Sequence, residues 1–221
     1  MHRSYTAGLL LLTASTGAID AVSYLSLDKV FTGNMTGNVL FIGFALVGVA
    51  GIPLLNNVIA LLGFVVGSIV SGRIVGRGHK VKIPKSSAWV LLVGGAIAIG
   101  LGVTWILIPD LPHYLILLIT FLLAVVMGAQ VSAVKPIGNS DITTIVVTNT
   151  LANLARDSRL GGGKGQAWVH RLFAVVFMGL GAMVGAWVIN TWGGPWALFV
   201  AMVIYLAGSI TLIVAGRRKL V

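Results

Sequence analysis

The stretch Thr32-Gly33-Asn34-Met35-Thr36-Gly37-Asn38 doubles a Thr-Gly-Asn triplet and stands between two long apolar runs. Six of its residues are small or polar, and a hydrocarbon core offers no hydrogen-bond partner to such groups. Glycine tolerates breaks in a helix, while threonine and asparagine both donate and accept hydrogen bonds. The stretch therefore predicts a broken helix inside a membrane domain, with this segment facing protein or water; helix–helix packing by small residues is the alternative.

The composition around this stretch is that of a membrane protein. Of the 221 residues, 57% are hydrophobic and 9% are charged, and the mean hydropathy is +1.02. An ordinary soluble domain has about 25% charged residues. The absence of cysteine excludes disulfides and thiolate metal sites. The net charge of +10 lies in loops between apolar runs, so it indicates topology and contact with anionic lipid, and no nucleic-acid partner is expected.

Apolar runs between helix breakers predict an all-α membrane protein with a single transmembrane domain over residues 1–221. A helix needs roughly 20 apolar residues to cross a bilayer. Six such spans are expected: Ala7 to Leu27, Leu54 to Val75, Ala88 to Ile108, Tyr114 to Val134, Trp168 to Asn190 and Trp196 to Ala215. Two shorter stretches, Phe31 to Ala50 and Asp141 to Ala155, are expected to be short broken or re-entrant helices.

Clusters of Lys and Arg predict the orientation in a bacterial inner membrane. They occur at Arg73 to Lys85, Arg156 to Arg171 and Arg217 to Lys219, and such clusters mark cytoplasmic loops. This places the carboxyl terminus in the cytoplasm and makes both short stretches re-enter on the side they leave. A full crossing is the alternative, and the apolar run Val39 to Ala50 makes it a real one for the first stretch.

The two halves of the chain resemble each other at an offset of about 111 to 114 residues. Small residues recur in matching order: Gly17, Ala18, Gly67 and Ser71 in the first half, and Gly128, Ala129, Gly181 and Gly185 in the second. Three spans and one short element per half would turn the second copy upside down. We therefore predict inverted repeats over about residues 5–109 and 112–216; chance similarity among common membrane residues is the alternative.

Asp20 is the strongest candidate for a functional residue in this sequence. It lies deep in the first span, where an ionised carboxylate is costly unless paired, hydrated or protonated. We expect it to couple transport to protons or cations; a structural carboxylate that caps the nearby broken helix is the alternative. Tyr24 lies one turn later on the same face and could bond to Asp20 or to a substrate.

In the second half, Gln130 stands on the helix that corresponds to the first span, and Thr144, Thr148 and Asn149 are expected on one face of the short stretch. We expect this face to meet Thr32 to Asn38. The predicted substrate-binding residues are Asp20, Tyr24, Thr32, Asn34, Thr36, Asn38, Gln130, Thr144, Thr148 and Asn149. The four histidines are too scattered for a metal site, and no catalytic residue or cofactor is expected.

The run from Thr16 to Tyr24, followed by Val30 to Asn38, resembles the YoaK-like family of bacterial membrane proteins. The similarity extends over the full chain. The resemblance implies a polytopic membrane protein with this segment as a shared motif, and it implies no particular activity or substrate.

The residues favour a secondary transporter of a small polar or anionic solute, with alternating access between the repeats and proton coupling through Asp20. A passive channel is the main alternative. A lipid-acting membrane enzyme would need a nucleophile with a base or paired carboxylates, so we expect no enzyme; a structural subunit is a further alternative. The lipid bilayer, the solute and a second copy in a homodimer are the expected partners.

Overall fold

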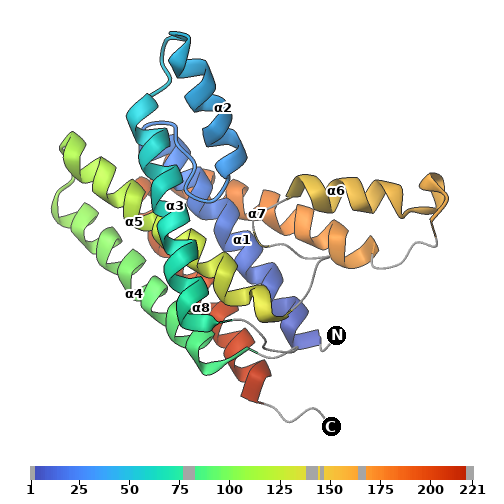
Figure 1. The fold of residues 1–221 in the computed structure, drawn as a ribbon. Helices are drawn as coiled ribbons and strands as arrows, with labels where there is room; N and C mark the ends of the chain where they lie inside the picture. The colour runs from blue at the N-terminus through green and yellow to red at the C-terminus, as the bar shows by residue number, and fades with distance from the viewer. Residues whose placement is uncertain (1–2, 77–82, 138–143, 145–146, 164–167, 218–221) are drawn as a thin grey trace.

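The computed structural model describes residues 3–76, 83–137, 144, 147–163 and 168–217. In this part of the chain the regular structure is entirely helical (Figure 1). The helices are α1 (Arg3–Ser26), α2 (Met35–Leu46), α3 (Leu54–Val75), α4 (Lys85–Leu107), α5 (His113–Val134), α6 (Val147–Arg156), α7 (Trp168–Trp192) and α8 (Gly194–Arg217), with short 3-10 turns at Lys135–Ile137 and Arg159–Gly161.

Six of these helices are long and apolar enough to cross a membrane, as the sequence predicts. They are α1, α3, α4, α5, α7 and α8, each of 22 to 25 residues. Prolines at positions 53, 84 and 112 directly precede three of them, where a missing amide proton costs nothing. The protein is therefore a multi-pass membrane protein.

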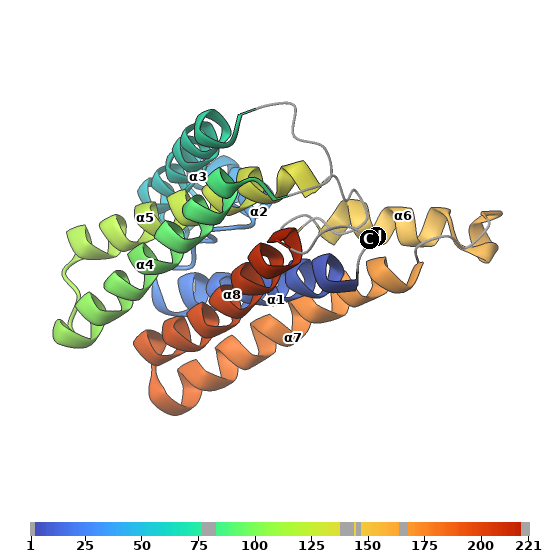
Figure 2. The ribbon, with the colours of Figure 1, turned by 90° about the horizontal axis from the view of Figure 1, so that it is seen from below.

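The short helices α2 and α6 leave the crossing pattern of the long helices unchanged. With 12 residues, α2 is about 18 Å long, against a hydrocarbon core of about 30 Å. α1 and α3 run in opposite directions, as do α5 and α7 (Figures 1 and 2). The chain thus returns, after each short helix, to the end of the bundle that it left, so neither short helix adds a crossing of the bundle.

α1 is the central helix of the bundle. Of its membrane window, 78% is buried within the protein, against 22–44% in the other five spans. α7 and α8 pack along it, and α3 packs along α5 (Figure 2). Buried hydroxyls on α1 bond to its own backbone: Thr13 Oγ1 donates to the Leu9 carbonyl over 2.9 Å. The buried faces of α1 can therefore carry hydroxyl side chains at little cost in stability.

Glycines let two pairs of helices cross with their backbones in contact. A Cβ at Gly67 of α3 would fall on the Val125 carbonyl of α5. A Cβ at Gly181 of α7 would fall on the Ala14 carbonyl of α1. Reciprocal contacts join Gly128 to Phe64 and Gly17 to Met178. Small residues thus allow close packing in the absence of a strong hydrophobic drive between helices in lipid.

The stripe Gly63, Gly67 and Ser71 packs within the protomer. Ser71 Oγ donates to the Ala129 carbonyl over 2.9 Å, and a Cβ at Gly63 would meet the Phe121 carbonyl. The stripe is therefore filled by α5 and is not a free surface for a second copy. Aromatic side chains at the span ends are exposed as interfacial anchors should be: Tyr114, Trp168, Trp192 and Trp196.

Candidate functional site

The Asp20 carboxylate holds the backbone of the segment that precedes α2. Its Oδ1 accepts hydrogen bonds from the amides of Thr32 (3.1 Å) and Gly33 (2.7 Å), and its Oδ2 accepts one from the Asn34 amide (3.1 Å). Asp20 is only 6% exposed. Three consecutive amides therefore converge on one buried carboxylate, which holds the segment before α2 against the central helix α1.

The two asparagines of the Thr-Gly-Asn repeat fix this segment from its own side. Asn38 is fully buried; its Nδ2 donates to the Phe31 carbonyl over 2.6 Å, and its Oδ1 accepts from the Phe31 amide over 3.0 Å. Asn34 is the N-cap of α2, with Oδ1 accepting from the Gly37 amide over 3.4 Å, a residue type that favours helix starts. The Thr-Gly-Asn repeat thus supplies a helix cap, Asn34, and a side chain, Asn38, that fixes the Phe31 backbone.

The far end of α2 has a defined stop. Gly48 adopts a φ of 82°, its amide donates to Ala45 over 3.0 Å, and the Val49 amide donates to Phe44 over 3.1 Å. This is the Schellman pattern, in which a left-handed residue closes the helix and satisfies its last carbonyls. Both ends of the short helix are therefore encoded locally.

α5 contributes Gln130 to the same buried polar junction. Gln130 Nε2 donates to Thr16 Oγ1 over 3.3 Å, and Thr16 lies one turn before Asp20 on α1. The Thr16 methyl would lie 3.1 Å from a Cβ placed on Gly33. Two polar atoms of this junction, Thr32 Oγ1 and Gln130 Oε1, are buried without a hydrogen bond among the described residues. α1, α5 and the segment before α2 thus meet in a buried polar junction that has unused hydrogen-bonding groups.

Tyr24 belongs to an aromatic cluster and is not bonded to Asp20. Its ring stacks on Phe31, with centroids 4.9 Å apart, and lies 6.3 Å from the ring of Phe41. Phe31 and Phe41 are also stacked, at 6.0 Å. The cluster packs the segment before α2 and α2 itself against the end of α1.

The chain's similarity to other proteins agrees with this architecture. Residues 8–211 match the family described as protein of unknown function (DUF1275). The chain belongs to the DUF1275 family. One relative is the UPF0700 transmembrane protein YoaK of Bacillus subtilis (strain 168), which is 32% identical over 156 residues, or 71% of this chain and 67% of the relative. No solved structure matches the chain. The resemblance to YoaK-like proteins inferred from the motif is confirmed.

The structure of this DUF1275 member separates the remaining predicted residues from the junction. The Asn34 side chain is exposed although its backbone amide bonds to Asp20. Thr36 is exposed on α2, and Thr148 and Asn149 are exposed on α6. Thr144 is buried, and most of the residues between 138 and 146 lie outside the described part. α2 packs on α3, whereas α6 packs on α7, so the structure does not bring the two short helices together as the sequence suggested.

α6 is held to α7 by charge at the surface. Arg171 Nη1 donates to the Asn153 carbonyl over 2.8 Å and to Asp157 Oδ2 over 2.7 Å. Arg156 Nε donates to Asp157 Oδ1 over 2.9 Å. The hydrogen bonds from Arg156 and Arg171 lower the pKa of Asp157 to about 2. This attachment uses an exposed carboxylate, unlike the buried one that holds α2.

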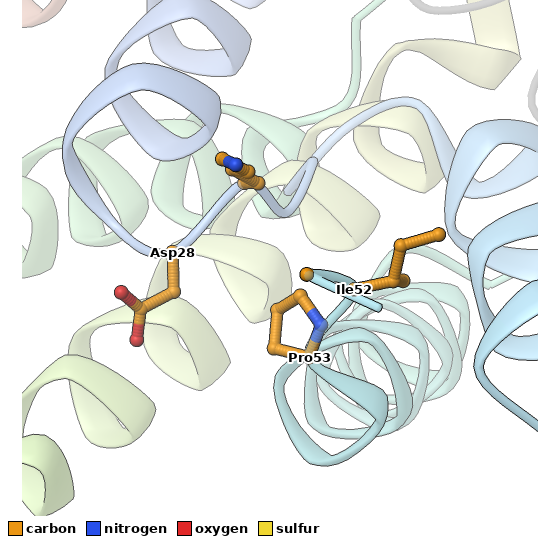
Figure 3. Close-up of a pocket in the computed structure, with 5 residues that line it drawn as sticks. Asp28, Ile52 and Pro53 are labelled. Carbon is orange, nitrogen blue, oxygen red and sulfur yellow. The ribbon is translucent and has the colours of Figure 1, made fainter. Parts of the chain in front are cut away.

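A pocket of about 390 Å³ opens near the end of α1, where no predicted site residue lies. Asp28 lies on one side, and Ile52 and Pro53 on the other (Figure 3). Asp28 and Lys29 both adopt a positive φ, of 61° and 55°, and such strain in non-glycine residues often marks functional segments. Asn56 donates to Asp28 Oδ2 over 3.1 Å. The pocket lies at the end of the bundle where α3 begins, and its lining combines the charged Asp28 and Lys29 with the apolar Ile52 and Pro53.

Proposed function

We propose that this protein is a secondary transporter for a small polar or anionic solute, and that it is not an enzyme. The observation that carries the proposal is the buried polar junction, where Asp20 binds the broken end of a re-entrant helix. Broken helices with unpaired backbone groups near the membrane midplane form substrate sites in many transporters. A buried carboxylate in a membrane span marks a functional site by its cost.

Two inverted repeats would supply the alternating access. α1 and α5 run in opposite directions, and so do the pairs α3 with α7 and α4 with α8 (Figures 1 and 2). The close crossings also exchange between the halves: Gly67 lies on Val125 as Gly181 lies on Ala14. Both pairs follow the sequence offset of 111 to 114 residues. This correspondence supports a pseudo-twofold axis in the membrane plane.

The charge distribution favours one orientation in a bacterial inner membrane. Arg73 ends α3 and Arg217 ends α8, and both chain termini lie at that end of the bundle (Figure 1). Asp28 and the pocket beside it belong to the opposite end. The positive-inside rule then places both termini in the cytoplasm and the Asp28 pocket outside. Solute would enter through this outer mouth.

Proton coupling through Asp20 is part of the proposal. Protonation would remove the charge that binds three amides and would weaken the attachment of α2. A switch of this kind biases a two-state element, here the re-entrant segment, between attached and released positions. The movement of α2 would open the junction to one side of the membrane.

Uptake into proteoliposomes tests the proposal. Purified protein is reconstituted, and a library of small solutes is screened for accumulation driven by an imposed proton gradient. Saturable uptake with counterflow is expected, and Asp20→Asn should abolish the dependence on the gradient. Asp110→Asn is the matched control, because this carboxylate is exposed in the turn between α4 and α5 and lines neither the pocket nor the junction. Flux without saturation or counterflow would indicate a channel, and unchanged coupling in Asp20→Asn would refute the role of Asp20.

A further inference from the structure

The three amides that bind Asp20 form an anion-binding concavity. Successive backbone N–H groups at residues 32–34 point at one carboxylate, with distances of 2.7 to 3.1 Å. Rows of amides of this kind bind phosphates and carboxylates in many proteins. Here the carboxylate of Asp20 occupies the concavity. A carboxylate is therefore a type of ligand that these three amides can bind.

The concavity has hydrogen-bonding groups that Asp20 leaves unused. The Thr32 hydroxyl lies near the carboxylate without completing a hydrogen bond to it, and Thr32 is fully buried. Gln130 Oε1 is also buried and unpaired among the described residues; this oxygen only accepts hydrogen bonds, so it can bond to a protonated carboxyl but not to a carboxylate. A buried polar atom without a partner is destabilising, and a ligand with the complementary group can remove that cost. The Thr32 hydroxyl is therefore a hydrogen-bond donor that a ligand at this site could use.

Asp20 has no cationic partner among the described residues. Titratable groups of the surrounding elements stand elsewhere: His113 opens α5, His170 and Arg171 open α7, Arg73 and Arg217 end α3 and α8, and the Tyr205 hydroxyl lies by Gly94. α2 carries no titratable side chain, and Tyr24 stacks on Phe31. Only neutral amides compensate the carboxylate, so replacing it by another carboxylate leaves the balance of charge unchanged.

We infer that the amides of residues 32–34 are the binding site for the carboxylate of a small monocarboxylate solute, and that Asp20 occupies this site while the solute is absent. The inference rests on the proposed transport function and names its substrate class. The solute carboxylate replaces Asp20 when the Asp20 side chain takes up a proton. One proton and one anion then enter the site together, so the loaded state has the same charge as the empty one.

Protonated Asp20 remains useful in the loaded state. A neutral carboxylic acid has one O–H donor, which can bond to an oxygen of the solute beside it. The Thr32 hydroxyl can donate to the same anion. Charge-assisted bonds of this type are about twice as strong as neutral ones, so the exchange of one anion for another loses little binding energy.

Binding of acetate to the purified full-length protein tests the inference without measuring transport. Acetate is fully ionised at both about pH 8 and about pH 6, so only the protein titrates. The affinity measured by thermal shift should rise as the pH falls, by up to about tenfold per unit, because only the protonated fraction is competent. Acetamide, the neutral probe of the same shape, should cause no shift.

Asp20→Asn removes the competing charge and the proton. This variant should bind acetate as tightly as the wild type does at the lowest pH, with no dependence on pH. A variant that binds acetate more weakly, or in a pH-dependent way, would overturn the inference. If Asp20→Asn does not fold, the pH series of the wild type and the Thr32 variant still decide.

Thr32→Val tests the unused hydroxyl. It should weaken acetate binding about three- to tenfold, since one hydrogen bond to a charged group is lost. Thr120→Val is the matched control, because Thr120 is also buried and unpaired among the described residues but lies ten residues, or about 15 Å, from Gln130 on α5. Equal effects of both variants, or no acetate binding at any pH, would refute the inference. Acetate binding without any transport would refute only the proposed function.

Discussion

The two short helices α2 and α6 are each attached to the bundle by a carboxylate, but the two carboxylates have different partners and different exposure. α2 is held at its beginning by Asp20, a carboxylate only 6% exposed that accepts three backbone amides. α6 is held at its end by Asp157, whose side chain is 33% exposed and which pairs with two arginines. One attachment joins a charge to neutral backbone within the protein, and the other joins a partly exposed carboxylate to two arginines.

This difference determines what can release each helix. Water and salt reach Asp157, so the attachment of α6 can exchange its bonds with solvent at small cost. Neither reaches Asp20, so α2 can leave its place only if the carboxylate is neutralised or another anion replaces it. Under the proposed function, the first half of the molecule holds a switch, whereas the second half holds an anchor.

Asp20→Ala should have the largest effect, because it leaves three buried amides without an acceptor. We expect a loss of about 3–5 kcal/mol in the free energy of unfolding, measured by SDS titration in mixed micelles. Asp157→Ala is the comparison, and its loss should be much smaller. Similar losses in the two variants would contradict the distinction between switch and anchor.

Asn38→Ala should cost about 2–3 kcal/mol, since it removes both hydrogen bonds to the Phe31 backbone and leaves those groups buried. The same unfolding titration measures it. Asn149→Ala on α6 is the control, because that side chain is exposed and its loss should stay within about 0.5 kcal/mol. A larger cost at Asn149 would mean that α6 has a buried polar role that the described contacts do not include.

Gly67→Ala and Gly181→Ala test whether the two halves correspond. Each added methyl meets a backbone carbonyl of the facing helix, so each variant should lose about 1–3 kcal/mol from overpacking. Gly72→Ala and Gly179→Ala lie on the same two helices where a Cβ meets nothing within 4 Å, and they should be neutral or stabilising. Losses that differ widely between Gly67 and Gly181 would count against a repeat.

Much of the fold could be predicted because its signal is long and local. The limits of α3 are those expected, Leu54 to Val75, and α5 begins within one residue of the expected Tyr114. Apolar runs of more than 20 residues allow few other structures in lipid. The break before α2 was also predictable, since the Thr-Gly-Asn repeat supplies a cap and a break within seven residues.

The site could be predicted only in part, because its main contacts are between a side chain and distant backbone. Asp20 is expected from its depth, and the alternative that it caps the nearby broken helix agrees with its three amide partners; what the sequence does not show is which amides these are. Thr16 was missed, since a threonine on an apolar helix usually bonds its own backbone, as Thr16 does to Leu12. Its contact with Gln130 requires knowledge of how α1 and α5 cross.

The smallest expected effect concerns salt and acid at α6. The pKa of Asp157 is about 2, below its ordinary value of 3.8. A lowered pKa means that the ion pair stabilises the attachment above about pH 4 and that this contribution is lost as the pH falls to about 2. Hydrogen exchange of the α6 amides, corrected for intrinsic rates, should therefore increase modestly in this window.

Hydrogen exchange of the α6 amides should also increase with about 0.5 M NaCl at neutral pH, because salt screens exposed pairs. The α2 amides should show no response to the same salt. If salt exposes α2 as much as α6, the buried carboxylate is reached by solvent, and the junction cannot act as a closed switch.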